Sequence, residues 1–260
     1  MKRLTAVVIS STELMPDTYL IWLRAPEIAA VAQPGQFLMV RCGDDHDPLL
    51  RRPFSVHRVA DAEQVALLFN VVGQGTWLLS QYQPGDRLDL LGPLGNGFSL
   101  HPGTRRLLLV AGGIGIAPLV LLADEALNQG RRVNLLMGAA EACLLYPRSL
   151  LPSSIDLAIA TEDGSEGRKG VVTDLIGDRI KQADQVFACG PVSMYQSIAA
   201  HGLAGDKSVQ VSLEVMMGCG LGACYGCTIR TRGGLRQVCH DGPVFELGDI
   251  LFVEGGDTRW

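Results

Sequence analysis

The sequence contains no run of basic residues longer than a pair, such as Arg105 and Arg106, and acidic residues are in excess. Its 22 Lys and Arg residues are outnumbered by 27 Asp and Glu residues, which gives a formal net charge of −5. Proteins that bind nucleic acid concentrate positive charge on one face, because they neutralise phosphates. We therefore expect no nucleic-acid partner.

Long hydrophobic runs are also scarce. Residues 107–123 form an uncharged stretch of 17 residues, at the short limit for a membrane span. Glycines and Pro118 at its centre divide it into a strand, a turn and the start of a helix. The N-terminus has only about five apolar residues before polar ones return, too few for a secretory signal. These features predict a cytoplasmic protein that does not enter a membrane.

Structural disulfides are rare in the cytoplasm, so clustered cysteines there more often hold a metal or carry out redox chemistry. The chain has 7 cysteines, four of which lie between residues 219 and 239. The other three are scattered, and we expect each of them to be a small buried apolar residue: Cys42, Cys143 and Cys189.

The length of 260 residues suits about two domains and a small third module. Over residues 1–100, short stretches rich in β-branched and aromatic residues alternate with turn formers, which predicts an antiparallel barrel or sandwich. Over residues 101–210, apolar stretches alternate with helical ones, which predicts an α/β domain with a parallel sheet. The segment 211–260 loses this alternation and carries the clustered cysteines.

A glycine-rich turn, AGGIGIAPL at residues 111–119, follows the first apolar strand of the middle region. Glycines there let the backbone approach a phosphate, and a helix N-terminus offers free N–H groups. The spacing of Gly113, Gly115 and Pro118 differs from the G-x-G-x-x-G dinucleotide fingerprint, so a turn needed only for packing remains the alternative. Beyond the second strand, Glu141 is either a ligand for a ribose hydroxyl or an exposed surface acid.

The stretch RRPFS at residues 51–55 places an arginine, an aromatic ring and a hydroxyl at the start of a strand. Alternation along a strand puts Arg52 and Phe54 on one face and Ser55 on the other. The planar guanidinium of arginine suits a phosphate. The alternative is an edge strand with a surface arginine.

Two glycine-rich stretches follow in the same region. NVVGQGTW at residues 70–77 places Gly73, Gly75 and Thr76 where a helix can begin, which suits either a phosphate cradle or a plain turn. GPLGNGF at residues 92–98 is expected to be a loop that closes the barrel.

The clustered cysteines follow the pattern C-x4-C-x2-C-x11-C, at Cys219, Cys224, Cys227 and Cys239. Glycines between and beside them let the backbone fold closely around a small group. The spacing of the first three is the plant-type spacing of a [2Fe–2S] cluster. Zinc is an alternative, although its ligands usually come in two close pairs. Disulfides and free thiols are further alternatives.

Taken in order, these motifs resemble those of the electron transfer subunits of NAD-linked, two-subunit dihydroorotate dehydrogenases, which belong to the ferredoxin-reductase superfamily. The motifs are RRPFS, GPLGNGF, AGGIGIAPL, ACGP, LEVMMGCGLGACYGC and CHDGPVF. The resemblance implies an FAD-binding β-barrel over residues 1–100, an NAD-binding α/β domain over 101–210 and a [2Fe–2S] module over 211–260.

The resemblance also implies a role for individual residues, none of which acts as a catalytic acid or base. The residues expected at FAD are Arg52, Pro53, Phe54, Ser55, Leu68, Phe69, Asn70, Gly75 and Thr76. Those expected at NAD are Gly112, Gly113, Gly115, Cys189 and Gly190. The cluster ligands would be Cys219, Cys224, Cys227 and Cys239.

The same resemblance implies a partner, a catalytic dihydroorotate dehydrogenase subunit bearing FMN, in a dimer of heterodimers that serves pyrimidine biosynthesis. Between Glu214 and Arg230 the only ionisable residues are the cysteines and Tyr225, so this segment is expected to dock on the partner or to pack internally against Met216 and Met217. Two other functions are possible, the small subunit of an NADPH:ferredoxin oxidoreductase or sulfhydrogenase, and a zinc-bearing binding module. Four cysteine ligands favour the dehydrogenase subunit.

Overall fold

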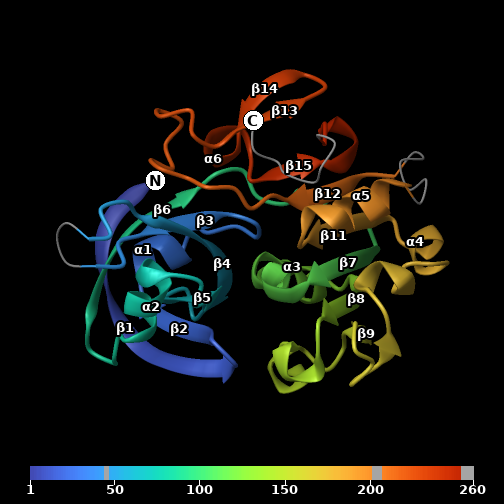
Figure 1. Ribbon diagram of the computed structural model, residues 1–260, viewed down its shortest axis with the longest axis horizontal. Helices are drawn as coiled ribbons and strands as arrows, with labels where there is room; N and C mark the ends of the chain where they lie inside the picture. Colours follow the sequence, from blue (N-terminus) through green and yellow to red (C-terminus); the bar gives the residue numbers. More distant parts are fainter. Residues whose placement is uncertain (44–46, 201–206, 253–260) are drawn as a thin grey trace.

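The computed structural model describes residues 1–43, 47–200 and 207–252 (Figure 1). Six strands form a closed antiparallel barrel in the order β1-β2-β5-β4-β3-β6, which decides between the barrel and the sandwich. They are β1 (Lys2–Met15), β2 (Thr18–Arg24), β3 (Phe37–Val40), β4 (Arg52–Ala60), β5 (Gln64–Asn70) and β6 (Arg87–Leu94). Two short helices accompany the barrel, α1 (Pro26–Ala29) and α2 (Gln74–Ser80).

The side chains of β3 alternate between two cores. Leu38 and Val40 belong to the apolar core of the barrel, whereas Phe37 and Met39 belong to a second core outside it. Alternation in a strand requires this division, because successive side chains point to opposite faces. The outer face of β3 is therefore buried by other parts of the chain and not exposed to solvent.

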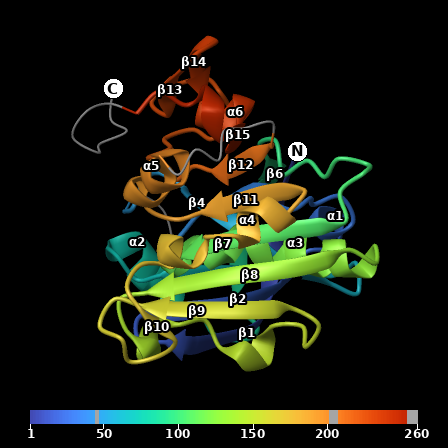
Figure 2. The ribbon, with the colours of Figure 1, turned by 90° about the vertical axis from the view of Figure 1, so that its right-hand side faces the viewer.

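A seven-stranded sheet forms the second part, in the order β10-β9-β8-β7-β11-β12-β15. All neighbours in it are parallel except β12 and β15, and Figure 2 shows its central strands side by side. The strands are β7 (Arg106–Gly112), β8 (Arg132–Ala139), β9 (Asp156–Thr161), β10 (Arg168–Lys169), β11 (Gln185–Cys189), β12 (Val209–Ser212) and β15 (Val244–Glu246). The predicted parallel α/β domain is confirmed.

Helices and single helical turns connect these strands. The α-helices are α3 (Ala117–Asn128), α4 (Arg179–Gln182) and α5 (Val192–Ala200). The 3-10 turns are η1 (Gly113–Ile116), η2 (Ala142–Leu144), η3 (Arg148–Leu150), η4 (Val172–Leu175) and η5 (Leu247–Asp249). The uncharged stretch 107–123 is divided among β7, η1 and the start of α3, and none of the described helices has the length and apolarity needed to cross a membrane.

The cysteine-bearing segment forms a small module above the other two parts (Figure 1). It consists of the hairpin β13 (Thr228–Thr231) and β14 (Gly234–Gln237) and of the helical turn α6 (Val238–Asp241). Its next strand, β15, leaves the module and pairs with β12 of the large sheet. The expected boundary at residue 210 thus falls inside β12, and the last strand of the sheet comes from the segment 211–260.

All three parts share one apolar core. Met39 from the barrel, Val211 from the sheet and Ile229 from the cysteine module all belong to it, together with Cys227 and Cys239. The loop after β6 adds polar contacts, since Asn96 Nδ2 donates to the carbonyl oxygens of His240 and Asp241, each at 3.1 Å. This loop therefore does more than close the barrel, because it also anchors α6.

A buried histidine joins the barrel to the sheet domain. His57 on β4 is fully buried, with Nδ1 2.9 Å from the carbonyl oxygen of Ala117 and Nε2 3.0 Å from the hydroxyl of Tyr146. Beside it, Arg58 Nε lies 3.0 Å from a carboxylate oxygen of Asp124. Burial lowers the pKa of His57 from 6.5 to about 4, so the ring stays neutral in the folded protein.

Because His57 is buried as a neutral ring, we expect the fold to lose stability in acid. Above pH 6.5 the ring is neutral whether the chain is folded or unfolded. As the pH falls from 6.5 towards 4, only the unfolded chain gains the proton, so stability is lost over that window. The lowered pKa of His57 corresponds to a loss of about 3 kcal/mol in the free energy of unfolding once the pH has fallen to 4. Urea unfolding at pH 7.5 and pH 5 should show a smaller loss for His57→Gln than for the wild type, and an equal loss would contradict the assignment.

Candidate functional site

The cysteine loop turns its backbone N–H groups towards its sulfur atoms. The N–H of Leu221 donates to Cys219 Sγ at 3.3 Å, and that of Gly222 donates to Cys239 Sγ at 3.2 Å. The positive φ values of Gly220 and Gly222, 71° and 77°, allow this tight course. Hydrogen bonds from N–H groups stabilise thiolate ligands and tune iron–sulfur clusters.

The side chains of the four cysteines lie near one another. Cys219 interacts with Cys224, and Cys239 interacts with Cys227 and with Cys219. Two thiolates on each of two irons is the arrangement that a [2Fe–2S] cluster requires. Four cysteines whose sulfur atoms accept backbone N–H groups are a donor set that fits a [2Fe–2S] cluster.

The thiols differ in acidity. Burial raises the pKa of Cys219, but hydrogen bonds from the N–H groups of Leu221 and Cys224 outweigh this effect and lower the pKa to about 6. Burial and the neighbouring Cys227 raise the pKa of Cys239 to about 12. Cysteines bind a metal as thiolates, so the positive charge of a bound cluster would have to overcome the raised pKa of Cys239.

The scattered cysteines lie elsewhere. Cys42 and Cys189 are buried as expected, but Cys143 is exposed on η2, so the expectation of a buried residue was wrong there. The single helical turn at this position turns the side chain outward, and the sequence carries no signal for that orientation.

The two arginines of RRPFS have different surroundings. Arg51 Nη2 lies 2.7 Å from a carboxylate oxygen of Asp89, and its Nη1 donates to the Asp89 carbonyl at 2.9 Å, so it ties β4 to β6. Among the residues that the structure describes, no acid pairs with Arg52; its Nη1 donates to the carbonyl of Leu50 at 2.7 Å. A Cβ at Gly75 would lie 3.3 Å from Arg52 Nε, so this guanidinium stem lies against the start of α2. The two predicted phosphate elements, RRPFS and Gly75, are thus neighbours.

The register of β4 sets which motif residues share a face. Phe54 pairs with Leu38, and Ser55 pairs with Phe37, so Phe54 points to the barrel side and Ser55 to the outer face. The predicted alternation is confirmed. Since β4 pairs with β3 on one side and β5 on the other, the alternative of an edge strand is wrong.

The remaining residues expected at FAD lie around this strand. Phe69 packs on Phe54, with ring centroids 5.4 Å apart, and Leu68 is buried on the face towards the sheet domain. Asn70 Oδ1 accepts a hydrogen bond from Thr18 at 3.0 Å. Thr76 Oγ1 accepts the N–H group of Val72 at 2.8 Å, so it orders its own loop. Direct contact of these residues with FAD stays a prediction.

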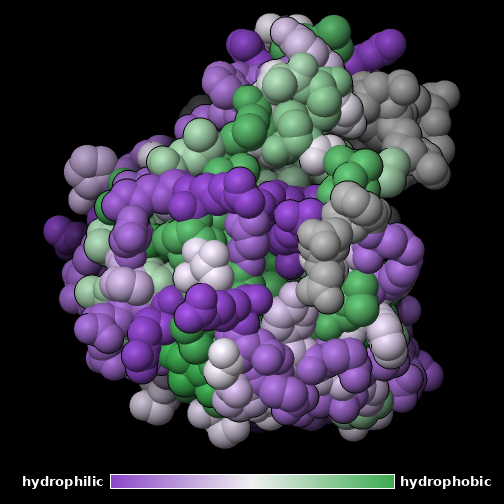
Figure 3. All heavy atoms as spheres, turned by 90° about the vertical axis from the view of Figure 1, so that its left-hand side faces the viewer, coloured by the Kyte–Doolittle hydropathy of each residue, from purple (hydrophilic) through white to green (hydrophobic). Residues whose placement is uncertain are grey.

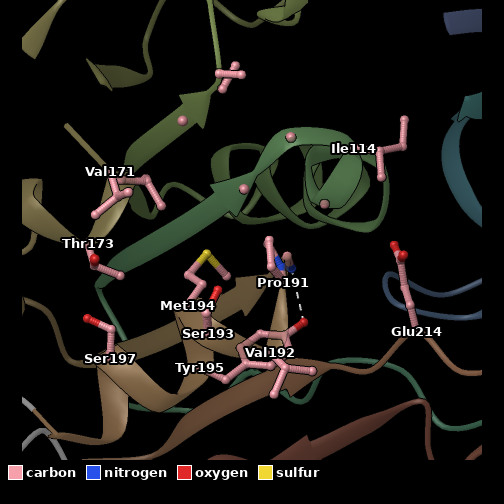
Figure 4. A pocket seen from close by; sticks show the side chains of 18 of the residues that line it. Ile114, Val171, Thr173, Pro191, Val192, Ser193, Met194, Tyr195, Ser197 and Glu214 are labelled. Atoms are coloured by element: carbon pink, nitrogen blue, oxygen red, sulfur yellow. Dashed lines mark hydrogen bonds between the residues drawn. The ribbon is translucent and has the colours of Figure 1, made fainter. Parts of the chain in front are cut away.

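A pocket of about 610 Å³ lies at the carboxyl ends of the parallel strands (Figure 4). Ligands of open α/β sheets bind at such ends. Its lining includes four of the predicted glycines and two acids, namely Gly112, Gly113, Gly115, Gly190, Glu162 and Glu214. A Cβ on Gly115 would collide with the carbonyl of Cys189, so only glycine allows η1 to pack on β11. Cys189 is buried behind this contact, and its side chain does not line the pocket.

Three residues of the pocket carried no signal that we recognised in the sequence. Tyr195 accepts the N–H of Gly190 at 3.0 Å and donates to the Ser212 carbonyl at 2.6 Å, which orients the turn after β11. Glu162 follows β9, whereas Glu141, the acid that the sequence suggested, does not line the pocket. Glu214 points into the cleft, and the surrounding protein raises the pKa of its carboxyl by desolvation.

The two acids mark opposite ends of the pocket. Glu162 follows β9 and Glu214 follows β12, with β8, β7 and β11 between them. Four strand spacings of about 4.8 Å separate these strands by roughly 19 Å. Figure 4 shows Glu214 and Ile114 at one side of the pocket and Val171 and Thr173 at the other. The pocket therefore has the length for an extended ligand that runs across the sheet.

Solved structures with this architecture define the class. A structure described as an NADH-dependent reduced ferredoxin-NADP oxidoreductase aligns with a TM-score of 0.85 and 28% identity, over 95% of this chain and 89% of that chain. A ferredoxin NADP+ reductase from Neisseria gonorrhoeae shares the fold, with a TM-score of 0.66 and 18% identity over 82% of this chain and 100% of that chain. The fold is that of the ferredoxin reductases, with a cysteine-bearing module added.

The sequence comparisons identify a narrower family within this fold class. The model of the iron–sulfur cluster binding domain of dihydroorotate dehydrogenase B matches residues 214–251. The electron transfer subunit of dihydroorotate dehydrogenase B (NAD(+)) from Desulforamulus reducens is 41% identical over 259 residues, covering 96% of this chain and 99% of that protein. Its counterpart from Geobacillus sp. is 39% identical over 258 residues, with the same coverage. The chain belongs to this family of electron transfer subunits, and the resemblance seen in its motifs is confirmed.

Replacing one exposed ligand tests the cysteine loop. Cys224→Ser should abolish most of the bound iron, because a serine hydroxyl at neutral pH does not replace a thiolate ligand. Flavin should be retained, since Cys224 is exposed and lies outside the shared core. Iron and acid-labile sulfide contents measure the outcome, with Cys143→Ser as the matched exposed-cysteine control. Full iron in Cys224→Ser, or equal loss in both variants, would contradict the assignment.

Proposed function

We propose that this chain passes electrons between NAD(H) and a catalytic subunit that oxidises dihydroorotate in pyrimidine biosynthesis. The observation that carries the proposal is the packing of a four-cysteine loop, whose sulfur atoms accept backbone N–H groups, onto a barrel that adjoins a pocket for an extended ligand. Bound FAD exchanges an electron pair with NAD(H), and a [2Fe–2S] cluster carries single electrons, so the two together connect two-electron and one-electron chemistry. When dihydroorotate is oxidised in the partner, NAD is reduced in this subunit.

The chain's own residues bind and orient these groups. Arg52 and the backbone at Gly75 bind the pyrophosphate of FAD, and Ser55 presents its hydroxyl on the outer face of the barrel. The glycines at 112, 113 and 115 let the NAD pyrophosphate approach the start of α3. Gly190 lies beside the nicotinamide, held by Tyr195. No side chain acts as a general acid or base.

Glu162 supports a preference for NAD over NADP. The described lining residues of the pocket include Glu162 and Glu214 but no Lys, Arg or His. The Glu214 end of the pocket faces the blue ribbon of the barrel in Figure 4, which supports placing the nicotinamide there, near FAD, and the adenosine at the Glu162 end. A carboxylate there accepts hydrogen bonds from ribose hydroxyls and repels a 2′-phosphate.

Exchanging this acid should change the coenzyme preference. Glu162→Ala loses a charge-assisted hydrogen bond to the ribose, so the affinity for NADH should fall about ten- to a hundredfold. The affinity for NADPH should rise or stay constant, because the repulsive charge is gone. Binding titrations with both coenzymes measure the ratio, and Glu141→Ala, an acid outside the pocket, is the control. An unchanged ratio of NADH affinity to NADPH affinity in Glu162→Ala would show that Glu162 does not contact the coenzyme.

The docking face for the catalytic subunit is the surface of the cysteine loop. Met216, Leu221 and Tyr225 are 78%, 46% and 71% exposed, so they do not pack internally. In Figure 3 the module at the top stands out as pale and green against the largely purple surface below it. A contiguous apolar surface of this kind is typical of a protein contact. The partner carries FMN, and two such pairs assemble as a dimer of heterodimers in the cytoplasm.

Coexpression with a catalytic subunit of this enzyme type tests the function. The wild-type pair should copurify and reduce NAD when supplied with dihydroorotate. Leu221→Glu should weaken association and slow this coupled reaction, while NADH-driven reduction of an artificial acceptor at FAD continues. Val31→Glu, at an exposed apolar position of the barrel, is the control and should behave as the wild type. A Leu221→Glu variant that assembles and reduces NAD at the full rate would place the docking face elsewhere.

One alternative function has a specific observation in its favour. The solved oxidoreductase studied for flavin-based electron bifurcation matches over 95% of this chain. Four cysteines in the loop, and the greater identity of the dehydrogenase subunits, favour dihydroorotate oxidation. Purification of the native complex separates the two, because the partner is either a dihydroorotate-oxidising subunit or one that uses NADPH and ferredoxin. A colourless, zinc-containing protein would exclude both functions.

A further inference from the structure

The cysteine loop rests on a single methionine of the barrel. A Cβ on Gly220, the residue after the ligand Cys219, would lie 2.5 Å from Met39 Cγ, 2.9 Å from its Sδ and 3.4 Å from its Cε. The backbone of the loop is therefore in direct contact with this side chain. Met39 is fully buried and belongs to the same apolar core as Cys227 and Cys239.

The same methionine lies on the face of the barrel that carries Pro53 and Ser55 of the flavin motif. Met39 pairs with Pro53 across β3 and β4, and Phe37, two residues earlier, pairs with Ser55. Side chains of directly opposite residues in an antiparallel pair point to the same face. Met39 therefore lies beside the outward residues of RRPFS and also contacts the backbone of the cysteine loop.

The backbone hydrogen bonds of the module lie mainly away from residues 219–222. The hairpin β13–β14 pairs with itself, the N–H groups of Arg232 and Leu251 join it to the following segment, and Asn96 of the barrel loop anchors α6. Where the loop meets the barrel at Gly220, the contact is one of side-chain packing. A thioether fills an irregular space well, because its three rotatable bonds adapt to the surface above it.

We propose that Met39 is the positioning residue that sets the separation between the cysteine loop and the flavin-binding face of the barrel. The proposal rests on the proposed function for the identity of the two bound groups, but the contact itself belongs to the chain alone. Electron transfer between two groups slows steeply as the gap between them widens. A side chain that fixes this gap therefore controls how fast electrons cross from one module to the other.

A double-mutant cycle isolates the contact. Gly220→Ala adds a methyl group that collides with Met39, and it also strains a residue whose φ is 71°. Adding Met39→Ala should relieve the collision and leave only the strain. Gly222→Ala is the matched control, because its φ is 77° but its methyl group would meet Gln237 and His240 instead. Met39→Ala should therefore rescue Gly220→Ala and not Gly222→Ala.

The first readout is independent of any bound group. In the cofactor-free chain, amide hydrogen exchange of residues 219–227 should accelerate by about fivefold or more in Gly220→Ala and in Met39→Ala, and the double variant should show non-additive exchange. Met39→Val, which lacks the atoms beyond the γ-position but stays apolar, serves if Met39→Ala does not fold. Met137→Val, at a buried methionine in the core on the other side of the sheet, controls for general loosening.

The second readout uses the loaded protein. After mixing with NADH, flavin bleaching should keep its wild-type rate in the Met39 variants, while bleaching of the cluster should slow by about fivefold or more at full iron content. The role of Met39 would be overturned if Met39→Val and Gly220→Ala kept the wild-type rates of cluster bleaching and of amide hydrogen exchange. It would also be overturned if Met39→Ala rescued Gly222→Ala as well as it rescues Gly220→Ala. A wild-type protein whose cluster is never reduced by NADH would instead overturn the proposed function, and the exchange data would still decide the contact.

Discussion

The apolar core beneath the cysteine loop is the constraint on which the rest of the molecule depends. It draws side chains from β3 of the barrel, from β11 and β12 of the sheet, and from the segment that holds Cys227 and Cys239. A small metal-binding module has too little apolar surface for an independent core. Here it completes its core with surface from both neighbours, so the position of the cysteines is tied to the position of the barrel and of the sheet.

Strand pairing reinforces this arrangement. β15 follows the cysteines in the chain, yet it pairs antiparallel with β12 and so covers the edge of the large sheet. An uncovered parallel edge would expose unpaired N–H and C=O groups. Because the chain crosses from the sheet to the cysteine loop and returns, Glu214 at the exit from β12 stands both at the nucleotide pocket and at the entrance to the loop. The pocket and the loop are adjacent for the same reason.

Electrostatics differ between the two predicted nucleotide sites. At the barrel, Asp89 pairs with Arg51 and Arg3, whereas no acid among the described residues pairs with Arg52, which lies next to the start of α2. At the sheet, acids lie at both ends of the pocket, and close backbone approach at the glycines takes the place of basic side chains. Under the proposed function, a guanidinium would bind the phosphates in one site and backbone N–H groups would bind them in the other, while the acids would accept hydrogen bonds from hydroxyl groups.

By itself the sequence determined the barrel, the parallel sheet, the cysteine-bearing module and the glycines that line the pocket. These depend on local spacing: a period of two or a run of apolar residues, glycine at a tight turn, and ligands close together in the chain. Only the tertiary structure decided that Arg52 lies against Gly75, that Glu162 and not Glu141 lines the pocket, and that Met39 lies under Gly220. Each of these contacts joins residues from different strands or modules. Their proximity follows from strand order and from the shared core, and no local pattern in the sequence encodes either.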